Sequence, residues 1–206
     1  MSKIIQAFKE NAKEEHWLSR KSEKAVREKV NAATIKVGYP HYLWDEAEFS
    51  ARYRALEITE GHWFENIVNT DKFSLKQTFA KIGQKRDNSH WITVPHLVNA
   101  FYVITKNEVV IPAGILQPPF FYSDVIPRSI SYGAIGHVLG HELTHGFDDT
   151  GRKFDNAGEM IRNDTGWSKL SIKHFKEKAE CLVKQFGQYK VLNKFHVRNL
   201  LNILSL

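Results

Sequence analysis

The chain has 206 residues, of which 42% are hydrophobic and 25% are charged, and its formal net charge is +6. This length suits one domain or part of a larger one, and the composition is that of an ordinary soluble globular protein, not of a disordered or fibrous one. Because the charge is modest and the lysines are scattered, the composition argues against a nucleic-acid-binding protein.

Further absences narrow the class of protein. No run of apolar residues approaches the roughly 18 that cross a membrane, and the N-terminal segment is amphipathic and charged, without the apolar core of a signal peptide. Taken literally, the chain is made in the cytosol and stays there. Cys181 is the only cysteine, so no internal disulfide can form. Its place in a helical pattern favours a small buried hydrophobe.

The first ninety residues are predicted to be helical. Apolar residues repeat at helical spacing from Ile4 to Phe8 and again from Trp17 to Ala33, until Gly38-Tyr39-Pro40 ends the second run. The basic stretch 20–29 within that run is interleaved with glutamates, so we interpret it as a solvated helix face. Two further helices, at about 46–58 and 61–82, and a polar loop over 83–89 are expected next.

The pattern then changes to strands. Residues 98–104 (VNAFYVI) and 108–113 (EVVIPA) are rich in β-branched and aromatic residues, and Thr105-Lys106-Asn107 separates them. This arrangement predicts a β-hairpin with a short loop, and Pro112 is expected at a strand end or edge because it cannot donate to the ladder.

The remainder is predicted to be mostly helical. One helix should run from about Ile130 to Gly146, a turn-rich segment should follow over 151–163, and a last amphipathic helix should extend to about Phe186. Asp164 or Thr165 is a plausible N-cap for that last helix. Together these elements predict a mainly α (α+β) fold with a small β-hairpin or sheet.

The helix predicted at 130–146 carries His141-Glu142-Leu143-Thr144-His145, two histidines four residues apart with a glutamate after the first. Residues four apart lie on one helix face, so both imidazoles can ligate one zinc ion at about 2.0–2.1 Å. Glu142 is rotated by about 100° around the helix, so it flanks the metal and can act as a general base toward an attacking water. A five-residue pattern also arises by chance, and its null interpretation is an ordinary packed helix.

Two neighbours bear on this choice. Asp148 could accept the second imidazole N–H of a zinc-binding histidine, as such histidines generally require, or could simply be an acid at a helix end. His137 lies one turn before His141, but His137 and His145 are separated by about 12 Å along the axis, too far for one ion. We therefore interpret His137 as a flanking residue or as a group at the rim of the site.

Longer segments make the motif specific. The stretches VNAFYVITKNEVVIPAGILQPPFF, ISYGAIGHVLGHELTHGFDDTGRKFDNAGEM and CLVKQFGQY together resemble the neprilysin family (M13) of zinc metallopeptidases, and roughly residues 1–190 fit in order. The resemblance implies a thermolysin-like zincin region in which residues 1–90 form a helical segment before the catalytic core. Residues 91–206 would then hold the substrate strand, the HExxH helix and the following helix, and 1–206 would be one partial metallopeptidase domain.

The resemblance also implies roles for single residues. His141 and His145 would be ligands of one Zn²⁺ ion, Glu142 the catalytic base and Asp148 the acid behind a zinc-binding histidine. Asn99 and Ala100 match the NAFY strand whose polar groups hold a peptide substrate, and an edge strand can pair with an extended peptide through its backbone. Cys181 matches a cysteine that the family normally pairs in a disulfide.

The match stops before the third zinc ligand, a glutamate in a motif such as GENIADNGG. Glu180 is the last acidic residue of the chain, so we expect a domain truncated at its C-terminus. Such a chain is expected to hold zinc weakly and to have little peptidase activity. The alternative is a catalytically inactive peptide-binding or regulatory fragment. Family resemblance implies an extracellular or cell-surface location, peptide substrates as partners and no nucleic acid, whereas oligomeric state stays open.

Overall fold

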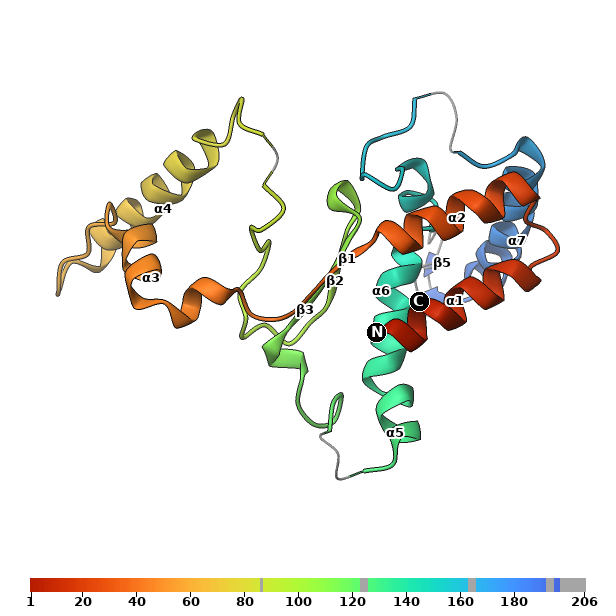
Figure 1. The fold of residues 1–206 in the computed structure, drawn as a ribbon, viewed down its shortest axis with the longest axis horizontal. Helices are drawn as coiled ribbons and strands as arrows, with labels where there is room; N and C mark the ends of the chain where they lie inside the picture. The colour runs from red at the N-terminus through yellow and green to blue at the C-terminus, as the bar shows by residue number, and fades with distance from the viewer. Residues whose placement is uncertain (86, 123–125, 163–165, 192–194, 197–206) are drawn as a thin grey trace. The chain divides into compact units, whose positions relative to one another are not determined.

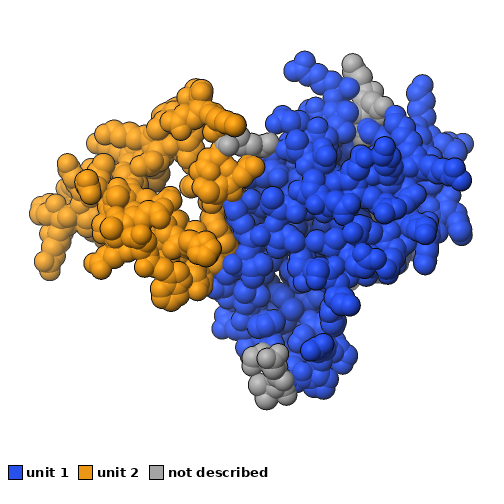
Figure 2. All heavy atoms as spheres, in the orientation of Figure 1, with its two compact units in different colours: residues 1–38, 95–206 blue, residues 39–94 orange. Residues whose placement is uncertain are grey.

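The computed structural model describes the chain except residues 86, 123–125, 163–165, 192–194 and 197–206. It contains two compact units: unit 1 comprises residues 1–38 and 95–206, and unit 2 comprises residues 39–94 (Figure 2). This grouping differs from the predicted division near residue 90, because the first 38 residues pack with the second half of the chain. That the whole chain forms one partial domain stays a prediction.

The helices of unit 1 enclose the first of its two hydrophobic cores (Figure 1). Ala12, Val26, Leu143, Phe147 and Trp167 are among its buried members. They come from, or lie next to, four helices: α1 (Ser2–Glu14), α2 (Arg20–Ala32), α6 (Ile135–His145) and α7 (Lys169–Gly187). The helical interpretation of both ends of the chain is thereby confirmed.

Reciprocal serine contacts join the beginnings of α2 and α7. Ser19 and Ser168 are the N-caps, and each side chain accepts a hydrogen bond from the backbone N–H three residues later. The N–H of Ser168 also donates to Ser22 Oγ, and the N–H of Ser19 donates to Ser171 Oγ, both at 2.9 Å. The last helix thus begins at Lys169, later than predicted. The expected caps Asp164 and Thr165 lie outside the described residues.

A three-stranded sheet forms the second core of unit 1. Its order is β1-β3-β2, with β1 (Thr34–Gly38) parallel and β2 (Phe101–Val103) antiparallel to β3 (Glu108–Pro112). The predicted hairpin is confirmed: β2 and β3 are joined by η2 (Ile104–Lys106) and Asn107, whose φ of 48° closes the turn. Pro112 lies at a strand end, as expected. Strand β1 was not predicted.

Other predictions for unit 1 need correction. The helix expected from Ile130 to Gly146 is two helices, α5 (Arg128–Gly133) and α6, because Ala134 leaves the helical conformation and the N–H of Ile135 bonds to the carbonyl of Phe120 instead. Cys181 is exposed, not buried. It lies two residues beyond buried Ala179 on α7, which rotates its side chain by about 200° to the opposite face.

Short elements complete the description of the chain. In unit 1, η3 (Ala113–Ile115) follows β3, η4 (Gly151–Lys153) follows α6, and β4 (Lys190–Val191) pairs with β5 (Phe195–His196). Unit 2 holds η1 (His41–Trp44), α3 (Glu46–Tyr53) and α4 (Trp63–Phe79), so both predicted helices exist but are shorter than expected. Within the part of the chain that is described, no helix is both long and apolar enough to cross a bilayer.

Candidate zinc site

The predicted histidine motif lies on α6, which is held between the two cores of unit 1. Leu143 is fully buried in the helical core, and Ile135 is buried in the core of the sheet. These apolar contacts fix the rotation of the helix, so that His141 and His145 are turned to a partly open face while Glu142 is only 6% exposed. The expected packing of the motif helix is therefore confirmed.

The two imidazole rings converge. Their Nε2 atoms are 3.1 Å apart and the ring planes are perpendicular. Donor atoms on one zinc ion lie at about this separation, because each Zn–N bond is about 2.0–2.1 Å long. Burial, followed by the neighbouring His145 and His137, lowers the pKa of His141. His141 is therefore neutral at neutral pH, and a neutral imidazole is the form that can ligate a metal.

Asp148 lies where the second of its two interpretations requires a carboxylate partner for a histidine. Its Oδ2 atom is 3.0 Å from Nδ1 of His145, and its Oδ1 atom accepts hydrogen bonds from the N–H groups of Thr150 and Gly151 at 2.9 and 2.6 Å. The carboxylate thus keeps the proton of His145 on Nδ1 and leaves a lone pair on Nε2, facing His141. This donor arrangement fits a zinc ion.

Glu142 flanks the two histidines from the buried side of the helix. Desolvation raises the pKa of its carboxyl group, while His145 and a hydrogen bond from the backbone of Tyr102 act in the opposite direction. Its pKa in the folded chain therefore lies above that of an exposed glutamate, which makes it a stronger proton acceptor near neutral pH. Tyr102 belongs to β2, so the sheet itself holds the carboxylate.

We expect Glu142→Gln to stabilise the metal-free chain at neutral pH. Because the folded chain keeps the Glu142 proton to a higher pH than the unfolded chain does, the free energy of unfolding falls as the pH rises through the folded-state pKa. A neutral amide removes this cost, and replacing a strained active-site group commonly gains about 0.5–2 kcal/mol. Urea unfolding at pH 4 and pH 7 measures the effect. A variant that is less stable than wild type at pH 7 would contradict this reasoning.

Asn99 and Ala100 lie immediately before β2 instead of within it. Ala100 is buried in the core of the sheet, whereas the exposed Asn99 uses its side-chain oxygen to accept a hydrogen bond from the N–H of Ala100. Strand β2 is an edge of the sheet, as an added peptide strand would require. Their role in substrate binding stays a prediction.

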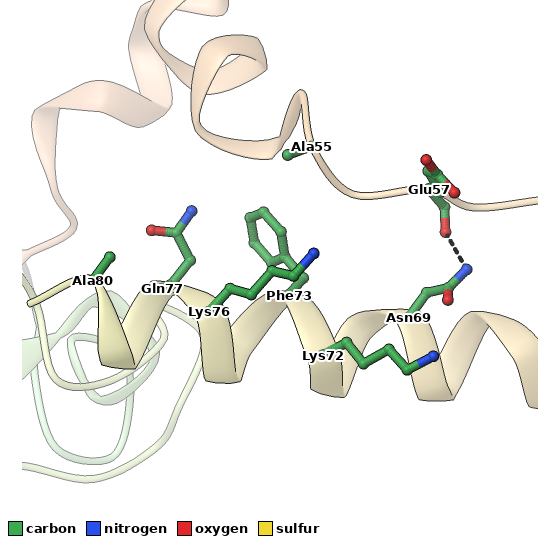
Figure 3. Close-up of a pocket in the computed structure, with 8 residues that line it drawn as sticks. All are labelled: Ala55, Glu57, Asn69, Lys72, Phe73, Lys76, Gln77 and Ala80. Carbon is green, nitrogen blue, oxygen red and sulfur yellow. Dashed lines mark hydrogen bonds between the residues drawn. The ribbon is translucent and has the colours of Figure 1, made fainter.

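Two hollows were compared with this site. The first, of about 320 Å³, lies between α1 and α6 and is lined by both His137 and His141, together with Phe8 and Asn11 of α1. His137, which is exposed, is thus at the rim of the site and not a ligand partner. The second hollow, of about 330 Å³, lies in unit 2 between α4 and residues 55–57, where Asn69 donates to the carbonyl of Glu57 at 3.2 Å (Figure 3). It contains no histidine or cysteine, so we assign it no catalytic role.

The third zinc ligand is not among the residues brought together here. In the described ranges, no group of three or more His, Cys, Asp or Glu side chains is placed to hold a metal ion. The site therefore provides two convergent nitrogen ligands, a carboxylate that orients one of them and a general base.

Comparisons with known proteins agree with this geometry. A model of peptidase family M13 matches residues 99–203. An endothelin-converting enzyme homolog from Locusta migratoria is 40% identical over 94% of this chain, and membrane metallo-endopeptidase-like 1 from Mus musculus is 38% identical over 92%. A zinc metalloprotease of Mycobacterium tuberculosis, solved with an inhibitor, superimposes on 92% of the chain with a TM-score of 0.81 and 31% identity.

These findings define first a class and then a family. The fold is that of the zinc-metallopeptidase region of these relatives, mostly helical with a small sheet, as the sequence predicts. The chain belongs to peptidase family M13. It spans about a quarter of the length of its relatives, 26% and 24% of the two proteins and 27% of the solved chain.

Proposed function

We propose that this chain carries the two-histidine and general-base part of a zinc-dependent metalloendopeptidase that hydrolyses peptide bonds in short peptides. The observation that carries the proposal is the pair of facing Nε2 atoms of His141 and His145, with Asp148 on the far side of the second ring. Two relatives whose names include the terms metallo-endopeptidase and zinc metalloprotease support the reaction class.

His141 and His145 would hold the ion, and zinc, when bound, supplies the Lewis acidity that polarises a substrate carbonyl and makes water a nucleophile near neutral pH. Glu142 takes the proton of the attacking water and returns it to the leaving amine, a role that its raised pKa favours. Asp148 holds His145 in the required tautomer. Asn99 and the free edge of β2 would align the substrate backbone, which makes extended peptides the expected partners.

By itself the chain is expected to bind zinc weakly, because two protein ligands and no third carboxylate are available for the ion. Catalytic zinc sites typically have three protein ligands and one open position. Little or no turnover by the isolated chain follows. The other candidate function is a catalytically inactive fragment that binds peptides, which the exposed edge of β2 favours. By the family, we propose an extracellular or cell-surface location.

Metal analysis combined with peptide hydrolysis tests the proposal. The chain is dialysed against micromolar zinc, its bound metal is counted, and cleavage of short fluorogenic peptides is followed for wild type and for Glu142→Gln. We expect substoichiometric zinc after dialysis and cleavage at or near background. Near-stoichiometric zinc with turnover that Glu142→Gln abolishes would refute the expected impairment, whereas the absence of any zinc binding would refute the metal site itself.

A further inference from the structure

Lys29 is a buried cation on a helix whose other charged side chains are mostly solvated. Its side chain is 4% exposed, and it shares one face of α2 with the core residues Val26 and Val30. This position corrects the interpretation of residues 20–29 as a solvated face. A buried ammonium group costs free energy unless hydrogen bonds compensate it, so its partners show what it does.

The partners of Lys29 are backbone carbonyls of the segment that follows the zinc motif. Its Nζ atom donates to the carbonyls of Gly146, Gly151 and Phe154 at 2.8, 2.6 and 2.8 Å. An ammonium group has three N–H donors, and all three are used. The three acceptors lie more than 110 residues away along the chain, so one side chain ties α2 to three points of one loop.

Two of these carbonyls bracket Asp148. Gly146 directly follows His145, and Gly151 closes the turn in which Asp148 accepts hydrogen bonds from the N–H groups of Thr150 and Gly151. Because Lys29 binds both ends of this turn, it limits how far the Asp148 carboxylate can move from Nδ1 of His145. The contact between those two groups is 3.0 Å.

A second connection runs from Lys29 to the general base. The carbonyl of Lys29 accepts a hydrogen bond from Nδ2 of Asn107 at 2.9 Å, and Oδ1 of Asn107 accepts one from the hydroxyl of Tyr102 at 2.7 Å. The backbone of Tyr102 in turn donates to Glu142. One residue of α2 is therefore connected to both the His145–Asp148 pair and the strand beside Glu142.

The electrostatics do not favour Lys29 as a mere stabiliser of the core. Burial lowers its pKa to about 8, and the more distant charges of Asp155 and Asp148 only partly oppose this. Well-packed hydrophobic residues are often as stable as buried ionic groups, and such groups are retained in some proteins because they specify one conformation. The three convergent carbonyls indicate which conformation is specified here.

We propose that Lys29 is a positioning residue for the zinc-binding histidine His145: its ammonium group fixes the Gly146–Phe154 loop and thereby keeps the Asp148 carboxylate against the His145 ring. This inference rests on the proposed zinc site for its metal-binding consequence, whereas its effect on the loop is independent of metal. The residue lies outside the HExxH motif and would not be found by searching for metal ligands.

The test compares Lys29→Met with Ser22→Ala, a control on the same helix. Ser22 is fully buried but accepts from Ser168 at the start of α7 and does not contact the Gly146–Phe154 loop. Both variants are studied at a denaturant concentration where each is folded by circular dichroism. Amide hydrogen exchange of Thr150 and Gly151 and the ¹⁵N chemical shifts of the His145 ring are measured without metal, and zinc affinity is then measured by chelator competition.

We expect Lys29→Met to raise exchange at Thr150 and Gly151 at least about tenfold and to shift His145 toward mixed tautomers, with zinc affinity about 10–100-fold weaker, the usual cost of losing a partner behind a metal ligand. Ser22→Ala should leave all three readouts at the wild-type values. Equal effects of the two variants, or unchanged exchange and tautomer in Lys29→Met, would overturn the proposal. If wild type binds no zinc but the metal-free readouts change as expected, the positioning role holds and the proposed metal site fails.

If Lys29→Met does not fold, the wild-type chain supplies the deciding measurement. Acylation of Lys29 by a small amine reagent is compared with that of Lys24, which is 77% exposed on the same helix. Because coupling between two sites is reciprocal, saturating zinc should slow modification of Lys29 at least about tenfold and leave Lys24 unchanged. The same rate at Lys29 with and without zinc, in a chain that binds zinc, would contradict the proposal.

Discussion

Gly151→Ala is expected to destabilise unit 1 by about 3 kcal/mol, the upper part of the range for overpacking a folded structure. A Cβ atom at this position would overlap the carbonyl oxygen of His145 and the backbone of Gly146. Both obstacles are backbone atoms at the end of the motif helix, so no side chain can move aside to make room. The turn itself would have to open, and Asp148 with it.

The same substitution should therefore weaken zinc binding as well as folding. Displacing the Asp148 carboxylate from His145 is expected to cost about 10–100-fold in zinc affinity, as the loss of a partner behind a metal ligand usually does. Thermal unfolding by circular dichroism and chelator competition for zinc measure the two effects. They should appear together, because one turn carries both.

Gly140→Ala is the matched control for this prediction. Gly140 lies on α6 directly before His141, and a Cβ atom there meets no atom within 4 Å. Because glycine inside a helix costs about 0.5–1 kcal/mol relative to alanine, this variant should be slightly more stable than wild type. If Gly151→Ala were as well tolerated as Gly140→Ala, the tight turn after the motif would not be a requirement of the fold.

The site residues on α6 and just after it could be predicted from sequence because their chemistry is local. A spacing of four residues places His141 and His145 on one helix face, and Asp148 follows within one turn. The structure shows the ring nitrogens and the carboxylate in the expected contact. Periodicity alone predicts such geometry, since all three groups belong to one short segment.

Lys29 shows why other parts of the site could not be predicted. Its position at i+3 from Val26 and beside Val30 already placed it on the buried stripe of α2, but a lysine among charged residues is normally solvated. Its burial depends on three carbonyls more than 110 residues later, and no local pattern encodes that contact. Long-range hydrogen bonds outweighed the local propensity.

Strand β1 was missed for a similar reason, although its sequence carried a signal. Thr34-Ile35-Lys36-Val37 alternates β-branched residues with a lysine, as a half-buried strand does. The segment is short and directly follows a helix, so it was taken as the end of that helix. Its hydrogen-bonding partner β3 lies more than 70 residues later, with Thr34 opposite Glu108, and only that pairing makes the segment a strand.

His141→Ala and His145→Ala are each expected to abolish measurable zinc binding, with a dissociation constant raised at least about 100-fold, more than the loss of a residue behind a ligand costs. Only two convergent nitrogens are provided by the described residues, so removing either leaves a single ligand. Isothermal titration with zinc measures the loss. Because both rings are partly exposed, the substitutions should change stability little, and circular dichroism should report an intact fold.

His137→Ala is the control that makes this result specific. His137 is exposed and lies one turn before His141 in the same hollow, yet about 12 Å of helix separates it from His145. We expect its substitution to leave zinc affinity unchanged. If His137→Ala weakened zinc as much as His141→Ala, the ion would be bound by a looser cluster of three histidines, and Glu142 would no longer be placed beside it as a general base.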